Sequence, residues 1–440
     1  MNSHPLAHLL PDTATFSPQG ALHIAKHSVT ELAQRYGTPL YVFDRATIVN
    51  ACKLYQRAFE RHYTASPVRF LYASKAYLSP LIARMMAEQG MGLDVVSGGE
   101  LQVARQANFP MERISFHGNN KSEEELRLSL QNGVGRIVLD NWSELEQLTG
   151  LARAAGQRPA VLVRVAPDVQ TDTHRYLQTG HAASKFGFPL SNGEAKAAIM
   201  RILAEGQLSL VGLHAHNGTM LRETRPYEEC IARLFALVFE VYEETRWWPR
   251  EISPGGGWAV DAPKVAVLAQ ALQASIERQL RASKHGLAAP TLVIEPGRSI
   301  VARAGIAVYR IGTRKQTAGG IIYLFVDGGM GDNIRPALYG AQYNALAVER
   351  AFAPPEEQVC VAGRYCESGD ILIEQIMLPR MHDGELLALP VAGAYSLPMS
   401  STYNLVPRPA VVLVDGVDVQ VMERRETVDD LMQRYPIFDR

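Results

Sequence analysis

Lys75 stands just after a short apolar run, residues 68–73, whose composition is typical of a buried strand. Most lysines are solvated, and a lysine placed beside a buried strand costs free energy unless it has a function. Other apolar runs also end in polar, ionisable or glycine residues, namely Asp94, His117, Asp140, Arg164, His216, Gly255 to Gly257 and Glu295. This distribution predicts a site assembled from the ends of several strands.

The triplet Gly255-Gly256-Gly257 follows one of these runs and favours a phosphate site. It lacks the Lys-Ser/Thr pair of a P-loop and the spacing of a dinucleotide-binding fingerprint. Three glycines can still adopt a conformation in which their backbone amides point at one phosphate. Such a conformation suits a cofactor with a single phosphate group, and a flexible turn is the alternative.

Glu295 and His216 indicate that this cofactor carries a flat ring. A carboxylate at the end of a buried strand needs a cation as its partner, and a protonated pyridine nitrogen is such a cation. His216, in the string His214-Ala215-His216, is compatible with stacking on the ring. Two histidines at this spacing could also bind a metal or simply pack. No third ligand stands at a suitable spacing, so we predict no metal site.

The composition is that of a soluble globular protein suited to small-molecule chemistry. The chain has 440 residues, of which 47% are hydrophobic and 20% charged, and this suits a large barrel with a smaller appended domain. A formal charge of -1 gives no basic footprint for nucleic acid or an anionic membrane. The start of the chain lacks a secretory signal pattern, and the cysteines have no CxxC spacing. We therefore expect a cytoplasmic protein that binds neither nucleic acid nor membranes.

The alternation of apolar runs with segments of helical spacing predicts an α/β barrel. The expected strands are residues 68–73, 92–96, 114–116, 136–139, 160–165, 208–213, 251–253 and 291–294. The expected helices are residues 78–88, 100–108, 123–132, 142–154, 194–204, 227–245 and 265–283. Continuous hydrophobicity in the strands indicates a parallel sheet, and eight strands indicate a closed, TIM-like barrel. The loops at the carboxyl ends of barrel strands converge on one mouth, which would unite the polar residues named above.

After Pro296 the expected strands follow one another without helices, at residues 300–311, 320–326, 359–362, 385–390, 410–415 and 417–423. Such a series predicts a C-terminal antiparallel β domain. The run 39–42 is a candidate additional strand of its sheet. We therefore predict two domains: a cofactor-binding barrel at 45–300, and a β-sandwich or Greek-key-like domain formed by 1–44 and 301–440.

Several strings together resemble one known family. They are YASKA, GLDVVSGGEL, HRYLQTGHAASKFGF, PGGG, EPGRSIV, DGGMGDNIRPALYG, CESGD and AGAYSLPMSSTYN. In this order they are similar to the diaminopimelate decarboxylases, which are alanine-racemase-like, fold type III enzymes that use pyridoxal 5'-phosphate (PLP). The resemblance covers the chain from about Gly37 to Val414 and implies a barrel with a β domain. It also implies decarboxylation of meso-2,6-diaminopimelate to L-lysine, the last step of lysine biosynthesis.

The resemblance assigns roles to individual residues. Lys75 matches the lysine that holds PLP covalently, His216 the residue that stacks on its ring, and Glu295 the partner of its pyridine nitrogen. Together these groups make the ring an electron sink. The other matches to cofactor-binding positions are Asp94, Arg164, Thr219, Gly255, Gly256, Gly257 and Tyr395.

Cys366 and Glu367 match a pair that the family supplies from the neighbouring subunit. The resemblance therefore implies a homodimer whose active sites form only across the interface. Cys366 would then return a proton to the substrate carbon after CO2 has left. A buried free thiol, the common state of a cytosolic cysteine, is the alternative.

The charge of the matched residues predicts what lies at the distal end of the substrate. Arg298, Arg335 and Tyr339 match positions that bind this end, and two guanidinium groups suit a carboxylate. An ornithine or lysine decarboxylase would instead need an acidic partner for a distal ammonium. Glu367 is expected to bind the distal amine, and Tyr395 completes the substrate contacts. Structural salt bridges are the alternative role for the two arginines.

A few positions depart from the family pattern. Asn217 and Thr219 replace Ile and Ser, and Arg364-Tyr365 and residues 396–398 are unusual. Thr219 retains a hydroxyl group that can form the same hydrogen bonds as Ser. Asn217 and Tyr365 are expected near the substrate. The alternative is therefore a paralogous decarboxylase that acts on D-lysine, D-ornithine, L-ornithine, arginine or an amino acid of a specialised pathway.

Two further classes of protein fit less well. A racemase would use a tyrosine as its second acid or base, whereas this chain has Cys366 and the two distal arginines. A non-catalytic protein that regulates a partner enzyme would have lost Lys75 or Cys366, and both are present.

Overall fold

The computed structural model describes residues 4–169, 184–283 and 285–436, and it divides into two compact units. The barrel unit comprises Ala51–Ser299, and the β unit comprises Met1–Asn50 with Ile300–Arg440. The division falls within helices α2 (Arg45–His62) and α10 (Arg298–Val301). Most of the string HRYLQTGHAASKFGF, residues 174–183, lies outside the described residues.

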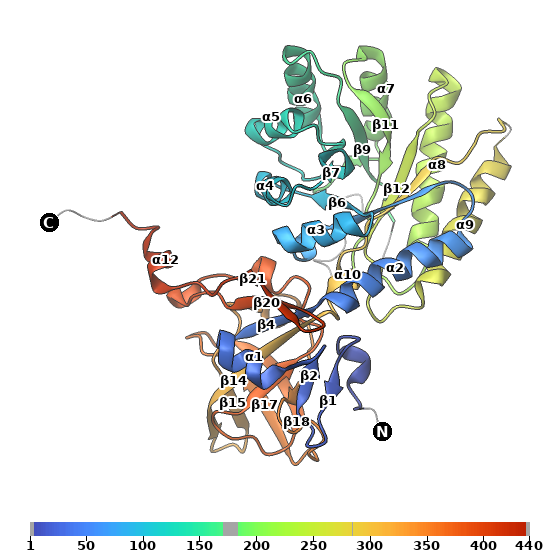
Figure 1. The fold of residues 1–440 in the computed structure, drawn as a ribbon. Coiled ribbons are helices and arrows are strands. Elements are labelled where there is room, and N and C mark those ends of the chain that lie inside the picture. Colours follow the sequence, from blue (N-terminus) through green and yellow to red (C-terminus); the bar gives the residue numbers. More distant parts are fainter. Residues whose placement is uncertain (1–3, 170–183, 284, 437–440) are drawn as a thin grey trace. The chain divides into compact units, whose positions relative to one another are not determined.

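The barrel unit contains the predicted closed barrel of eight parallel strands (Figure 1). The strands are β5 (Val68–Ala73), β6 (Gly92–Val95), β7 (Ile114–Phe116), β8 (Arg136–Leu139), β9 (Ala160–Ala166), β11 (Ser209–His214), β12 (Glu251–Gly255) and β13 (Thr291–Ile294). Pairing of β13 with β5 and of β8 with β9 closes the ring. The short strand β10 (Phe188–Pro189) adds to β9. The parallel barrel predicted from the continuous apolar runs is thus confirmed.

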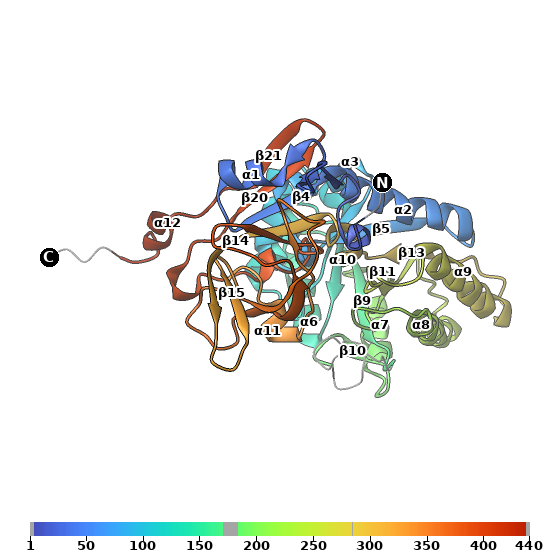
Figure 2. The same ribbon diagram turned by 90° about the horizontal axis from the view of Figure 1, so that it is seen from below.

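Helices follow the strands and cover the outside of the barrel, as Figure 2 shows for α7, α8 and α9. They are α3 (Pro80–Glu88), α4 (Gly98–Gln106), α5 (Glu123–Gln131), α6 (Trp142–Ala154), α7 (Glu194–Glu205), α8 (Arg225–Thr245) and α9 (Val265–Ala282). Ser79, Ser97, Ser122 and Asn141 each accept a hydrogen bond from the third amide of the helix that they precede. Such caps satisfy backbone groups that the first turn leaves without partners. They fix where α3 to α6 begin, close behind the strand ends.

The β unit contains a sheet in the order β18-β17-β15-β14-β4-β20-β21. Its strands are β4 (Leu40–Asp44), β14 (Gly305–Gln316), β15 (Ile322–Val326), β17 (Glu357–Ala362), β18 (Ile371–Leu378), β20 (Ala410–Asp415) and β21 (Asp418–Glu423), with β19 (Leu386–Leu389) paired to β14 and β16 (Leu346–Ala347). The candidate strand near residue 40 joins this sheet between β14 and β20.

Two details of the predicted β domain are wrong. The sheet is mixed, because β15 pairs parallel with β17 and β4 pairs parallel with β20. The expected strand 300–311 begins as the helix α10, and β14 starts only at Gly305. The core of the unit unites both ends of the chain, since Leu32 and Val42 share one apolar cluster with Ile306 and Val412.

The smaller elements of the β unit are β1 (Thr15–Phe16), β2 (Leu22–Ile24), β3 (His27–Ser28), α1 (Val29–Tyr36), α11 (Arg335–Tyr339) and α12 (Val428–Met432). Among the described residues, no helix has the length and apolar character needed to cross a membrane.

Candidate active site

The predicted site residues of the barrel unit lie at or just beyond the carboxyl ends of their strands. Lys75 follows β5 in a short 3-10 turn, Ser74–Ala76, and is exposed. Asp94 lies in β6 and Arg164 in β9, and both are buried. Glu295 follows β13 directly and is also buried. Because the strands of a barrel point the same way, these ends meet at one mouth.

The effects of these groups on one another's pKa values indicate that they lie close together. Burial raises the pKa of Asp94, the charge of Glu295 raises it further, and the cations Lys75 and Arg164 oppose the change. Burial lowers the pKa of His216 well below its usual value, and the positive charges of Lys75 and Arg164 add to this effect. The same two cations therefore act on residues from opposite parts of the ring of strands.

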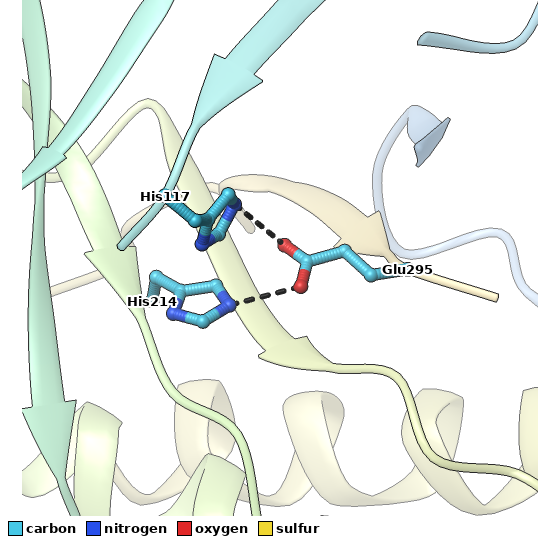
Figure 3. A group of neighbouring side chains, drawn as sticks. All are labelled: His117, His214 and Glu295. Atoms are coloured by element: carbon cyan, nitrogen blue, oxygen red, sulfur yellow. Dashed lines mark hydrogen bonds and ion pairs between the residues drawn. The ribbon is translucent and has the colours of Figure 1, made fainter. Parts of the chain in front are cut away.

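Two histidines lie next to the Glu295 carboxylate, and each faces a different one of its oxygens (Figure 3). His214 Nε2 lies 2.9 Å from Glu295 Oε2, and the hydroxyl of Ser253 donates to Oε1 at 3.0 Å. His117 Nε2 lies 3.9 Å from Glu295 Oε1. Burial alone would raise the pKa of Glu295, but the neighbouring His214 and His117 and the hydrogen bonds from His214 and Ser253 lower it overall. The site therefore contains a buried carboxylate that stays negative.

The group His117, His214 and Glu295 is also the one place among the described residues where three ligand atoms lie within 4.8 Å of one another. The predicted histidine pair does not form it, because His216 is not a member. His117 was named among the strand ends, but its role was not recognised, because its partners are distant in sequence. The hydrogen bond between His214 and Glu295 accounts for the approach of two of these three side chains, and His117 Nε2 lies beyond hydrogen-bond distance of the carboxylate.

The glycine triplet has a packing role. Gly255 and Gly257 have φ of +81° and +103°, which favours glycine. A Cβ at Gly255 would collide with the backbone and ring of His216, and one at Gly256 with the Glu295 carbonyl. The amides of Gly255 and Gly256 donate within the barrel, to Ser253 Oγ at 3.1 Å and to His216 Nδ1 at 3.2 Å. The triplet thus fixes the His216 ring, and its phosphate contact stays a prediction.

Two neighbouring ion pairs, Arg164–Asp140 and Lys121–Glu144, lie next to the mouth of the barrel. The Arg164 guanidinium lies 3.5 Å from Asp140 and sits over the Phe186 ring at 4.4 Å. Next to it, the buried Lys121 ammonium lies 2.6 Å from Glu144 and also donates to two backbone carbonyls. Burial raises the pKa of Glu144 and lowers that of Lys121, so each charge depends on the other.

Replacing Lys121 with methionine should therefore destabilise the protein strongly. The substitution leaves the Glu144 carboxylate buried without its cation, which typically costs about 3–5 kcal/mol. Urea denaturation would measure the loss in unfolding free energy. The double variant K121M/E144L should recover most of it, and K196M, which breaks an exposed pair with Glu240, should change little. Equal losses in K121M and the double variant would contradict this account.

The remaining predicted residues of the barrel unit are Thr219 and Arg298, both half-buried, in the loop after β11 and at the start of α10. The other five belong to the β unit. Arg335 and Tyr339 are the first and last residues of α11, at a spacing that places them on one side of the helix. Cys366 and Glu367 are exposed in the loop after β17, and Tyr395 lies after β19 with a positive φ of 64°.

The buried Asp370 joins the loops that carry four of these five residues, all except Tyr395. Its carboxylate accepts hydrogen bonds from the amides of Met330 at 2.7 Å and Tyr365 at 2.8 Å. Gly329 and Gly363 approach the same carboxylate so closely that a Cβ at either position would collide with it. The loop that leads to α11 and the loop that carries Cys366 are therefore held by one side chain.

Two hydrogen bonds bring the third string into the same group of loops. The amide of Ser401 donates to the Gly331 carbonyl at 2.8 Å, and the amide of Cys366 donates to Asn404 Oδ1 at 3.3 Å. The strings DGGMGDNIRPALYG, CESGD and AGAYSLPMSSTYN thus meet in space, although they are separate in sequence.

Asp370→Asn should weaken this junction. The amide offers one acceptor oxygen where the carboxylate offers two, so one of the two backbone amides loses its charged partner, at a cost of about 1.5–3 kcal/mol. Thermal or urea unfolding would measure the difference. D383N, which changes an exposed aspartate of the same unit, is the control. A D370N protein as stable as D383N would contradict the role given to Asp370.

Comparison with known proteins connects both units to one family. Residues 45–302 match the model of the pyridoxal-binding domain of pyridoxal-dependent decarboxylases. The chain is 40% identical to diaminopimelate decarboxylase of Bacillus subtilis, over 96% of this chain and 97% of that protein. It is 39% identical to the Mycobacterium tuberculosis enzyme of the same name, over 98% of both chains. The chain belongs to the diaminopimelate decarboxylase family.

A solved structure agrees with this membership of the diaminopimelate decarboxylase family. Diaminopimelate decarboxylase from M. jannaschii, in complex with L-lysine, superposes with a TM-score of 0.89 at 32% identity and covers 97% of this chain and 98% of its own. The protein is accordingly a pyridoxal-dependent lyase, and its cofactor is PLP.

The residues present in this member of the diaminopimelate decarboxylase family fit that cofactor. The Glu295 carboxylate is buried and negative, as a protonated pyridine nitrogen requires. The amine of Lys75 is exposed at the mouth, where it can form a covalent bond. The His216 ring is fixed by the Gly256 amide at 3.2 Å. These three features belong to the chain itself.

One departure from the family pattern has a structural explanation that differs from our prediction. Asn217 is 1% exposed, and its Nδ2 donates to the Pro226 carbonyl of α8 at 3.0 Å. Its side chain therefore joins the loop after β11 to a helix, and it is a packing residue. Tyr365 is buried as well, with its ring stacked on Tyr403 at 6.0 Å.

Proposed function

We propose that this protein removes CO2 from meso-2,6-diaminopimelate and releases L-lysine, in the last step of lysine biosynthesis. The observation that carries the proposal is the near-full-length identity of 40% to a diaminopimelate decarboxylase, in a chain that keeps every predicted catalytic residue. The alternative, a paralogous decarboxylase with another substrate, loses part of its basis because Asn217 packs against α8.

In this proposal the barrel unit binds the cofactor. When bound, PLP supplies an electron-withdrawing ring that stabilises the charge left on the substrate carbon. Lys75 holds the cofactor through its amine, and Glu295 keeps a proton on the pyridine nitrogen. His216 flanks the ring. Asp94, Arg164, Thr219, the glycine triplet and Tyr395 form the polar surroundings, with the phosphate assigned to the triplet and Tyr395.

The substrate is bound by charge. Arg298 and Arg335 hold the distal carboxylate, with Tyr339 beside them, and Glu367 binds the distal amine. Arg335 is already oriented, since its Nη1 donates to Tyr343 Oη at 2.6 Å. Its buried Nε has no hydrogen-bond partner in the part of the chain that the structure describes. A guanidinium group with a free N–H is suited to bind a carboxylate, which has two acceptor oxygens.

The decisive experiment is CO2 release by the PLP-loaded protein, with meso-diaminopimelate, L-lysine, L-ornithine, L-arginine and the D-isomers offered separately. Turnover of diaminopimelate with a large preference over the rest supports the proposal. Preference for a substrate with a distal ammonium and no distal carboxylate would replace it with the paralogue. Absence of CO2 from every amino acid would reject decarboxylation altogether.

We also propose that the active protein is a homodimer in which Cys366 and Glu367 serve the neighbouring subunit. Both are exposed in the single chain, as residues that serve another subunit must be. Cys366 would return a proton to the substrate carbon. The cytoplasm is the proposed location, since all four cysteines are free thiols.

Mixing two inactive variants tests this arrangement. K75A and C366A place their defects in different units of the chain. In a shared-site dimer, random exchange of subunits makes half of the dimers mixed, and each mixed dimer has one intact site of two. Activity should therefore return to about a quarter of the wild-type value. No recovery after verified exchange would show that each site takes both residues from one chain.

A further inference from the structure

Three side chains from separate strands meet inside the barrel, namely Glu295 of the predicted site and two histidines to which the prediction assigned no role. His117 follows β7, His214 ends β11 and Glu295 follows β13 (Figure 3). Their exposures are 4%, 1% and 5%. The two imidazole rings meet edge to face, with centroids 4.6 Å apart at 72°. Polar groups so deeply buried need hydrogen-bond partners, and here His214 and Glu295 are partners of each other.

The two histidines make different contacts with the carboxylates of the mouth. His214 Nε2 contacts Glu295 alone, at 2.9 Å. His117 Nε2 lies between the two acids, 3.9 Å from Glu295 Oε1 and 3.7 Å from Asp94 Oδ1. Among the described residues, neither this nitrogen nor Asp94 Oδ1 has a hydrogen-bond partner. A small rotation of the ring would bring His117 into a hydrogen bond with either acid.

We propose that His117 and His214 are positioning residues of the decarboxylation. They orient Glu295 for its contact with the pyridine nitrogen, and they ensure that Glu295, rather than Asp94, carries the negative charge. The inference rests on the proposed function and adds two residues to it. Two neighbouring carboxylates in a buried site do not both ionise easily, so the protein must favour one of them. His214 donates to Glu295 only, and this asymmetry selects Glu295.

The remaining charges around the cluster agree with that selection. The titratable groups that face it from the surrounding strands and loops are Lys75, Asp94, Glu100, Lys121, Asp140 and Arg164. The pKa of Asp94 is raised, by burial and then by the charge of Glu295, whereas the pKa of Glu295 is lowered overall. Burial lowers the pKa of His117 well below its usual value, so this ring is neutral and has one N–H to donate.

The variants His214→Phe and His214→Gln distinguish the role of the hydrogen bond to Glu295 from the role of the ring's size. Phenylalanine keeps a ring and removes the donor, whereas glutamine can place an N–H near the position of Nε2. We expect kcat of H214F to fall about 10–100-fold, as when a supporting hydrogen bond behind a functional group is removed. KM should change far less. The pKa of Glu295 rises without the donor, so the acid limb of the kcat profile should move to higher pH. H214Q should recover most of the loss.

A second readout does not depend on turnover. The visible absorption of bound PLP follows the protonation of its ring, so the pH titration of that band should move upwards in H214F and less in H214Q. His117→Gln should shift it in the same direction by a smaller amount. H285F is the matched control, because His285 contacts Glu243 at 2.6 Å on the outside of the barrel unit. Its spectrum and pH profile should equal those of the wild type.

The outcomes distinguish this inference from the proposed function. A wild-type protein that binds PLP and releases no CO2 would reject the function, while the spectral titration would still test the histidines. A spectrum and acid limb in H214F identical to those of H285F would overturn the inference. Equal impairment of H214F and H214Q would also overturn it, because a purely structural ring would then be responsible. If H214F does not fold, H117Q and H214Q decide the question, and wild-type titrations in both would overturn it.

Discussion

Lys75→Ala should abolish decarboxylation and leave the fold intact. We expect kcat to fall by at least about 10³-fold, within the range for loss of a positioned catalytic group. The physical reason is that the variant lacks the amine that holds the cofactor covalently. Lys121, the nearest buried lysine by chain position, is held by Glu144 at 2.6 Å. CO2 release under saturating PLP measures the loss.

The covalent bond itself can be observed. Reduction of the PLP-loaded wild type with borohydride, followed by peptide mass spectrometry, should place the label on Lys75. K53A is the matched control, because Lys53 is an exposed lysine of α2 in the same unit. It should keep both activity and label. A K75A protein with wild-type turnover, or a label on another lysine, would remove Lys75 from the mechanism.

Glu295→Gln should produce the second largest effect. The amide retains the size of the side chain and an oxygen for Ser253, but it carries no charge to offset a protonated pyridine nitrogen. We expect kcat to fall about 10²–10³-fold, the cost of removing one preorganised electrostatic group. The pKa of Asp94 should fall towards its usual value, because the charge of Glu295 contributes to raising it.

Acid stability provides an independent measurement for E295Q. The pKa of the wild-type carboxylate is lower in the folded protein than its unfolded value of 4.5. Its contribution to stability is therefore present above pH 4.5 and is lost as the pH falls below it. E295Q should lack this acid-dependent loss. E277Q, at an exposed glutamate that pairs with Arg281, is the control. Wild-type kcat in E295Q would show that the carboxylate is not the ring's partner.

The barrel was predictable because its strands are buried on both faces. Runs such as 114–116 and 136–139 are mostly apolar, and the structure places β7 and β8 at those residues. Strand β18 was missed because only some of its side chains are buried, and it contains Glu374 and Gln375. The helix α2 was missed as well. Its buried residues Ile48, Cys52, Tyr55 and Phe59 do recur at helical spacing, and this stripe was overlooked among the polar side chains.

The part of the site that lies at strand ends or in strings typical of the family was predictable. Lys75, Asp94 and Glu295 could be named in advance because each stands at the end of an apolar run. The pairing of His117 with His214 could not, since their strands are not neighbours in the barrel. Such contacts depend on how the ring of strands closes. Asp370 was missed for a similar reason, because its partners are backbone amides of other loops.

The position of β4 has a consequence for how the chain is made. This strand pairs with β14 on one side and β20 on the other, and both are synthesised only after the whole barrel. On the ribosome, the apolar strand β4 therefore stays unpaired while the barrel emerges and can fold. Unpaired strands of this kind are prone to aggregation. A nascent chain arrested after Ser299 should consequently recruit chaperones at its N-terminal segment, and release of the full chain should end that association.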